Sequence, residues 1–177
     1  LKNLGGVGQR LMDHPSINIA SFIKPEARIN EYSRRHLLVG MRYSSGLKNI
    51  PKGDMYVAVC SKTAWHSIGD QLAAFILFVN RTYSETGQVR LSTTDPYDEP
   101  IVEFNLLSDE RDLMRLMEGF RKMVLIQQTE PFQRISKEVF AAVYGDKVRQ
   151  VGKVNLQNKL LTKVFSKMLD GPDALRR

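Results

Sequence analysis

The sequence has 177 residues and a formal net charge of +7, with 42% apolar and 25% charged residues. These proportions are ordinary for a globular domain, and no apolar run approaches the roughly 18 residues that a membrane-spanning helix needs. The single cysteine excludes an internal disulfide, and one cysteine with three scattered histidines gives no zinc-ligand spacing, so no metal site is expected. The start shows no secretory pattern, so we expect a cytoplasmic protein.

A glycine-rich stretch opens the chain, GGVGQRLMDHP over residues 5–15. It has the first two glycines of a dinucleotide-binding loop, but Leu11 stands where the third glycine is required, and too little chain precedes it for the buried strand of that motif. Pro15 restricts His14 to extended or turn conformations. The stretch therefore predicts a glycine-rich connector leading into a strand.

Strands dominate the first two thirds of the chain. Apolar alternation or β-branched runs bounded by turn residues predict them at residues 16–24, 54–62, 72–83, 88–94 and 101–105. One helix is expected between the first two strands, with Asn30 as its cap and Gly46 at its end. The segment SETG, residues 84–87, is predicted to be a hairpin turn, with Gly87 at a positive φ.

Helices dominate the last third. Ser108 is expected to cap a helix that ends at Glu130-Pro131. Its apolar residues recur at helical spacing and are expected to pack on the sheet: Leu113, Leu116, Met117, Phe120, Met123 and Val124. A second amphipathic helix is predicted from Leu160, Leu161, Val164, Phe165 and Met168. The resulting fold class is α+β, a mainly antiparallel sheet of about five or six strands with helices packed on one face.

Basic residues are densest toward the end of the chain, at Lys147, Arg149, Lys153, Lys159, Lys163, Lys167, Arg176 and Arg177. No nucleic-acid motif accompanies them, so a solvated helix face is the simpler interpretation. The chain starts without methionine and ends LDGPDALRR, where Gly171 stops one helix and Pro172 opens another. We therefore expect a fragment of a longer protein.

Two segments together resemble the glucose–methanol–choline (GMC) oxidoreductase family. GVGQRLMDHP, residues 6–15, is similar to the family's connector between its flavin and substrate domains. Residues 87–123, beginning GQVRLSTTDP, are similar to its hairpin strand, Asp-Pro turn, Asn-x-Leu-Ser-Asp segment and following long helix. The resemblance implies that residues 1–15 are an inter-domain connector. It also implies that residues 16–177 form a substrate-binding domain, truncated before the C-terminal catalytic segment with its histidine base.

The resemblance further implies the chemistry of the parent protein, which would oxidise an alcohol carbon by hydride transfer to FAD. The fragment itself would hold no catalytic residue, no cofactor-binding residue and no metal, and would be inactive. Its partners would be a small-molecule alcohol substrate and the missing FAD-binding half of the same chain, without nucleic acid or a membrane span. The alternative is a stand-alone basic binding or interaction module without enzymatic activity.

The resemblance places Asp13, His14 and Ser16 at the edge of the active site. His14 is either a group that tunes the protonation of the reacting alcohol or flavin, or a structural histidine that caps a turn. Asp13 is expected to orient the loop. Ser16 stands where choline-oxidising members typically have a glutamate, and a neutral hydroxyl disfavours a quaternary ammonium substrate.

Three further residues are substrate-pocket candidates on the same grounds: Cys60, Ala64 and Trp65. Cys60 is otherwise a small core residue, as free cysteines usually are, and Trp65 is otherwise an anchor between layers. His36 and His66 are expected to be surface or helix polar residues.

Overall fold

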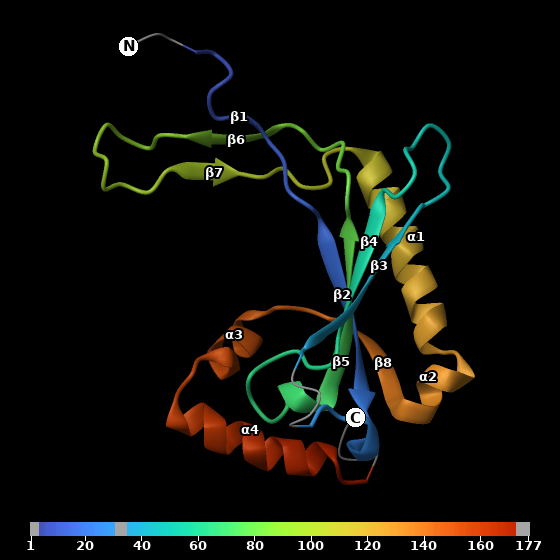
Figure 1. The fold of residues 1–177 in the computed structure, drawn as a ribbon. Coiled ribbons are helices and arrows are strands. Elements are labelled where there is room, and N and C mark those ends of the chain that lie inside the picture. The colour runs from blue at the N-terminus through green and yellow to red at the C-terminus, as the bar shows by residue number, and fades with distance from the viewer. Residues whose placement is uncertain (1–3, 31–34, 173–177) are drawn as a thin grey trace. The chain divides into compact units, whose positions relative to one another are not determined.

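The computed structural model describes residues 4–30 and 35–172 (Figure 1). Within these ranges eight strands form two antiparallel sheets, accompanied by four α-helices, which confirms the α+β class. The chain divides into two compact units. Of the described residues, the first unit comprises 4–16, 42–56 and 78–119, and the second comprises 17–30, 35–41, 57–77 and 120–172.

A three-stranded sheet lies in the first unit. Its strands are β1 (Gln9–Leu11), β6 (Gly87–Arg90) and β7 (Ile101–Glu103), in the order β1-β6-β7. Gln88 in the central strand pairs with Gln9 on one side and Glu103 on the other. Figure 1 shows β6 and β7 as the two arms of a long hairpin. The glycine-rich connector therefore runs into an edge strand.

The larger sheet has five strands in the order β3-β4-β5-β2-β8. Their bounds are β2 (Ser16–Ile23), β3 (Leu37–Tyr43), β4 (Met55–Cys60), β5 (Leu72–Val79) and β8 (Ser136–Ala142). The predicted strands at 16–24, 54–62 and 72–83 are thus confirmed in position. β2 pairs antiparallel with β8, with Ala20 opposite Phe140 and Asn18 opposite Ala142.

The helices follow the strands, except for β8, which lies between the second and the third. They are α1 (Glu110–Gln127), α2 (Glu130–Ile135), α3 (Asp146–Gly152) and α4 (Leu156–Leu169), with short 3-10 turns at Pro25–Ala27 and Gly69–Gln71. α1 matches the helix predicted before Pro131. The side chain of Asp109, not that of Ser108, accepts the hydrogen bond of the first turn, from the Arg111 backbone N–H at 2.9 Å.

The helix predicted between Asn30 and Gly46 is wrong. Residues 37–43 form β3, an edge strand paired with β4, and residues 31–34 lie outside the described part of the chain. Leu37, Leu38 and Met41 fit helical spacing, but they also fit an extended edge strand, and pairing with the neighbouring strand decided between the two.

The hairpin turn predicted at SETG is also wrong. β6 pairs with β1 and β7, whereas β5 belongs to the five-stranded sheet. Gly87 is not among the glycines with a positive φ. A Cβ atom there would lie 2.3 Å from the Leu11 carbonyl oxygen and 2.8 Å from that of Phe104. Glycine is therefore required by the close approach of two neighbouring strands and not by a turn.

The apolar stripe predicted on α1 is only partly buried. Leu116 and Met123 are buried, but Leu113 and Met117 are more than a third exposed. Polar residues take their place on the inner side of the helix, where Asp112, Arg115 and Gln127 are fully buried. In the second unit, Gln127 accepts a hydrogen bond from the Ser21 hydroxyl and donates to the Ile19 carbonyl at 3.3 Å.

Candidate functional site

The segment Asp13-His14-Pro15 is fixed to the end of β5 by two hydrogen bonds within the first unit. The Val79 backbone N–H donates to the Pro15 carbonyl at 3.0 Å, and the His14 Nδ1 lies 3.0 Å from the Val79 carbonyl oxygen. Pro15 has no N–H, so the imidazole supplies the donor that a backbone amide would otherwise provide. Because a carbonyl only accepts, Nδ1 carries the proton, and Nε2 is the ring nitrogen left free.

A cavity of about 480 Å³ lies beside this segment, entirely within the first unit. Its lining combines the connector, one loop residue and the chain that follows β5: Met12, Asp13, His14, Pro51, Asn80, Arg81, Thr82 and Tyr83. The Asp13 carboxylate accepts a hydrogen bond from the His14 backbone N–H at 2.7 Å, as expected of a residue that orients the loop. Asp13 and His14 therefore share one cavity.

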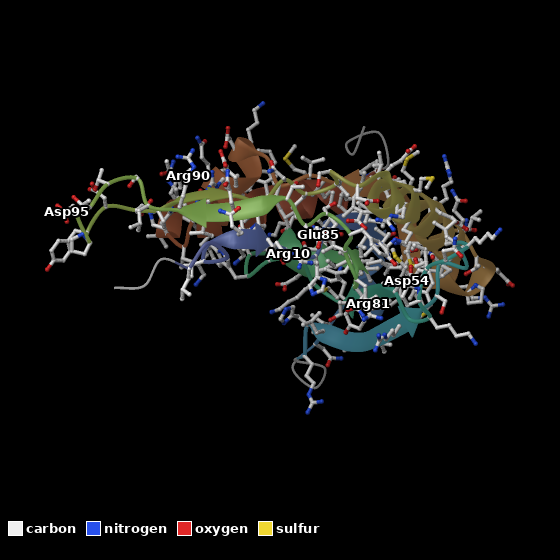
Figure 2. The ribbon with its side chains drawn as sticks, turned by 90° about the horizontal axis from the view of Figure 1, so that it is seen from above. Arg10, Asp54, Arg81, Glu85, Arg90 and Asp95 are labelled. Carbon is white, nitrogen blue, oxygen red and sulfur yellow. The ribbon has the colours of Figure 1, made fainter. Side chains whose placement is uncertain are left out.

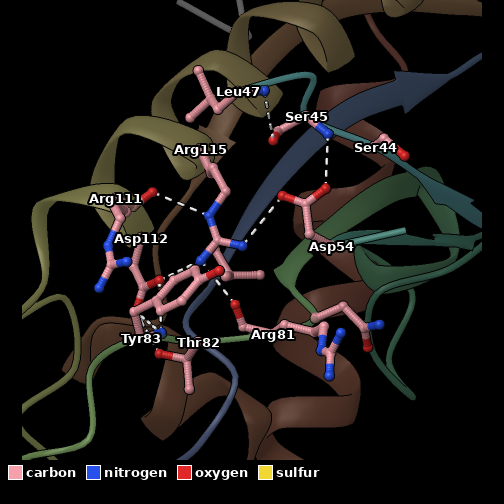
Figure 3. A network of polar contacts seen from close by, with 12 residues as sticks. Ser44, Ser45, Leu47, Asp54, Arg81, Thr82, Tyr83, Arg111, Asp112 and Arg115 are labelled. Carbon is pink, nitrogen blue, oxygen red and sulfur yellow. Dashed lines mark hydrogen bonds and ion pairs between the residues drawn. The ribbon is translucent and has the colours of Figure 1, made fainter. Parts of the chain in front are cut away.

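The cavity wall formed by residues 80–83, and Ser84 directly after it, are held by a buried carboxylate on α1. Asp112 accepts hydrogen bonds from the Thr82 hydroxyl, from the Tyr83 N–H at 3.0 Å and from the Ser84 N–H at 2.9 Å (Figure 3). Burial by itself raises the pKa of Asp112, but these hydrogen bonds outweigh it and hold the pKa below its usual value. Asp112 is therefore ionised at neutral pH.

Arg115 completes this network from the next turn of α1. Its guanidinium pairs with Asp112 and with Asp54 at 3.2 Å, and it donates to the Arg81 carbonyl at 2.8 Å (Figure 3). All three charged side chains are fully buried. Burial raises the pKa of Asp54, but hydrogen bonds from Ser45 and Arg115 leave it below its usual value. A buried ion triad thus fixes the backbone of the cavity wall.

The Arg81 guanidinium lies at the surface of the first unit (Figure 2). Over the described ranges it enters no ion pair within 4.0 Å, whereas Arg10 pairs with Glu85 on the same surface. The Tyr83 ring stacks under Arg111, whose guanidinium carbon is 3.7 Å from the ring centre. The cavity therefore presents one unpaired cation, one carboxylate and the free nitrogen of His14.

The other predicted site residue of the connector region, Ser16, is exposed at the first position of β2. Cys60 is buried at the end of β4, in the second unit, where it clusters with Ala20 and Ala74. Burial raises the pKa of its thiol, so Cys60 is a neutral, unreactive side chain at neutral pH. Ile76, Phe140 and Ala142 are partly buried and pack against this cluster.

Trp65 and Ala64 lie on the loop between β4 and β5. The Trp65 indole N–H donates to the Gly152 carbonyl at 2.8 Å, and its ring meets His66 edge-on at 5.6 Å. Trp65 and His66 line a second cavity of about 540 Å³, within the second unit, together with the start of α4. Ala64 does not line it; it packs against Gly69. Burial lowers the pKa of His66.

The buried triad of Asp54, Asp112 and Arg115 was not predicted from the sequence. A signal was present, because Asp112 and Arg115 are spaced i, i+3 and lie on the side of the helix that also carries Leu116. Burying charged side chains within an apolar stripe destabilises the fold unless each charge is offset by an opposite charge and by hydrogen bonds. Such a pair points to a buried partner elsewhere in the chain, which here is Asp54.

Three kinds of feature are absent from the described residues, 4–30 and 35–172. No group of three or more His, Cys, Asp or Glu residues is placed to hold a metal ion. No helix combines the length and apolar character needed to cross a bilayer. The glycine-rich stretch forms turns followed by strand β1, not the strand–turn–helix of a dinucleotide cradle.

A family model and two sequence relatives all point to the same family of proteins. A family model described as GMC oxidoreductase matches residues 82–165. The 5-(hydroxymethyl)furfural oxidase of Methylovorus sp. (strain MP688) is 36% identical over 120 residues, covering 66% of this chain and 21% of that protein. A glucose dehydrogenase [FAD, quinone] of Drosophila pseudoobscura pseudoobscura is 31% identical over 84 residues, covering 45% of this chain and 13% of that protein.

Solved structures agree at the level of the fold. A formate oxidase structure superposes with a TM-score of 0.61 at 17% identity, covering 80% of this chain and 34% of that one. A variant of Aspergillus oryzae formate oxidase gives a TM-score of 0.60 at 17% identity and covers 91% of this chain and 35% of that one. The matched part of the chain therefore spans between about an eighth and about a third of the length of these relatives and structures.

The matched segments support the GMC oxidoreductase family for this chain, as the resemblance of the connector and of residues 87–123 implied. The match to the family model, over residues 82–165, corresponds to a piece of the family's C-terminal domain.

Proposed function

We propose that this chain is the substrate-binding part of a flavoprotein that oxidises an alcohol by hydride transfer to FAD. The match to the GMC oxidoreductase family supports a flavin-dependent oxidation. The names of the two sequence relatives, a hydroxymethylfurfural oxidase and a glucose dehydrogenase, support a hydroxyl-bearing small molecule as substrate. In this proposal the 177-residue chain alone binds no FAD and oxidises nothing, because the flavin-binding half supplies the cofactor.

One observation carries the proposal: the hydrogen bond between His14 Nδ1 and the Val79 carbonyl. It holds the imidazole and leaves Nε2 free to accept a hydrogen bond or a proton, in a cavity that also contains the Asp13 carboxylate. An alcohol that loses a hydride must also lose its hydroxyl proton, and a neutral imidazole nitrogen can hold or accept that proton. The family resemblance assigns the main base to a later histidine, so His14 assists it.

The cofactor would supply the hydride acceptor when bound. Cys60 lies in a buried cluster with Ala20 and Ala74 in the second unit, and all three are at most 5% exposed. Such a cluster has no open surface for a flavin ring, so these residues would support the sheet and would not contact the cofactor. The neutral thiol of Cys60 adds no nucleophile.

Ser16 bears on the substrate class. Its exposed hydroxyl at the start of β2 carries no charge, and the proposal therefore favours an uncharged alcohol over choline.

The experiment uses the longer flavoprotein that contains this chain, with His14→Ala and, as a matched control, the exposed His36→Ala. Flavin reduction is followed by stopped flow across pH and normalised to bound flavin. We expect His14→Ala to slow reduction by roughly 10- to 100-fold and to change the pH profile, with His36→Ala unchanged. A normal rate and profile in His14→Ala, with poorer flavin retention, would show a structural histidine and contradict the proposed role of His14 in proton transfer.

A further inference from the structure

Helix α4, in the second unit, has its polar side turned inward. Thr162 is its one fully buried residue. The Gln71 side-chain amide donates to the Ser166 carbonyl at 2.7 Å, and Arg28 pairs with Asp170 just after the last turn, at 2.9 Å. These contacts fix the rotation of the helix about its axis, so the opposite side faces outward.

The outward side of α4 is apolar. We define the outer apolar face as Leu160, Leu161, Val164, Phe165 and Met168, which are all between 40% and 60% exposed. At 3.6 residues per turn these positions lie in one continuous arc of the helix. An amphipathic helix normally buries such an arc against its own domain, and a contiguous exposed arc marks an interaction surface.

A row of lysines borders the outer apolar face. Lys159, Lys163 and Lys167 are spaced by four residues and therefore lie one above another on the helix, and all three are exposed. Between Leu156 and Leu169 the helix has no acidic residue. Ahead of it, α3 and the following residue add Lys147, Arg149 and Lys153 against one acid, Asp146. This is the dense basic segment that the proposed function leaves without a role.

We propose that α4 docks on an anionic lipid surface, lying flat with its outer apolar face among the acyl chains. Because no carboxylate on the helix offsets the lysine row, the row is attracted to a surface of dense negative charge. Each lysine near that surface strengthens the electrostatic attraction to the anionic headgroups. Lysine stems reach upward along an apolar boundary while the ammonium groups stay at the phosphates. With three lysines and five apolar side chains, attachment is reversible.

A second copy of the chain fits this face less well. A two-fold contact through the outer apolar face would bring two all-basic rows into one interface with no carboxylate on α4 to offset them. The lipid surface is independent of the proposed oxidation, so either proposal can fail without the other.

The test uses the purified 177-residue chain and sedimentation with vesicles of phosphatidylcholine, with or without about one third phosphatidylglycerol. We expect binding to the anionic vesicles only, weakened at about 0.5 M salt. The triple variant K159E, K163E, K167E is expected to bind on the order of 100-fold more weakly. The matched control K48E, K52E, K62E makes the same charge change elsewhere and should bind within about threefold of the parent chain.

A second variant, Phe165→Ser, keeps every charge and removes apolar area, and should weaken binding about tenfold with unchanged helix content by circular dichroism. Equal binding to neutral and anionic vesicles, or undiminished binding of the α4 lysine variant, would overturn the proposal. So would a dimer in light scattering that Phe165→Ser dissolves. In the longer protein, a Val164→Cys thiol closed to maleimide without vesicles would also overturn it, because another protein segment would then cover the face.

Discussion

Arg115 and Asp112 pair inside the first unit with neither side chain exposed, and through this pair α1 holds the wall of the candidate cavity. Removing the carboxylate by Asp112→Ala would leave the Arg115 charge half-compensated and the N–H groups of Tyr83 and Ser84 without their acceptor. We expect a loss of about 3–5 kcal/mol in the free energy of unfolding, measured by urea denaturation.

The matched control for that variant is Glu85→Ala. Glu85 also pairs with an arginine, Arg10, but the two side chains are 52% and 73% exposed. Solvent screens such a pair, so the loss should stay below about 1 kcal/mol. Equal losses in the two variants would mean that the buried network does not stabilise the fold.

The same carboxylates predict a pH dependence of stability. The pKa values of Asp54 and Asp112 lie below their usual value of 3.8 in the folded chain. The unfolded chain therefore binds protons first as the pH falls. Their stabilising contribution should be complete above about pH 4 and should be lost below it, as the pH falls through the folded pKa values. Urea unfolding from pH 6 down to about pH 2.5 measures the slope.

Asp112→Asn serves as the reference for this pH series, because it cannot titrate at that position. Its stability should fall less steeply below about pH 4 than that of the parent chain. Parallel curves would place the acid sensitivity in other carboxylates, such as Asp170 beside Arg28.

Burial on α1 predicts a second stability difference, between two methionines on one helix. Met123 is 2% exposed, whereas Met117 is 47% exposed. Met123→Ala should cost about 2–5 kcal/mol through the cavity that it leaves, and Met117→Ala less than about 1 kcal/mol. Thermal unfolding of the two variants checks this. A larger loss in Met117→Ala would show that the Met117 edge of the predicted stripe, and not the edge with Met123, packs in the core.

The opening glycines should differ in their tolerance of a side chain. Gly8 has φ of 78°, and a Cβ atom there would lie 2.1 Å from the Val89 carbonyl oxygen, whereas nothing lies within 4 Å of a Cβ at Gly6. Gly8→Ala should cost at least about 1 kcal/mol and expose the Val89 amide, which donates to the Gly8 carbonyl at 2.7 Å.

Hydrogen exchange at the Val89 amide measures this effect, and Gly6→Ala is the matched control. Unchanged protection of Val89 in Gly8→Ala would mean that the β1–β6 pairing does not depend on glycine at this position.

Local pattern was sufficient for much of the fold. The alternation in residues 16–24, the apolar run after Gln71 and the helical spacing after Ser108 each predicted the element that the structure contains. Resemblance of residues 6–15 and 87–123 to GMC oxidoreductases predicted the family that the comparisons support. These features depend on neighbours in the chain, which a sequence displays directly.

Pairing between distant segments required the tertiary structure. Residues 37–43 became a strand because β4 offered a backbone partner, and Gly87 is glycine because Leu11 and Phe104 approach it. The buried triad joins Asp54 to Arg115 across 61 positions of chain, and Arg115 pairs in turn with Asp112. No local periodicity encodes such a partner, because a charge becomes tolerable in the core only when a distant opposite charge and its hydrogen bonds are brought to it by the fold.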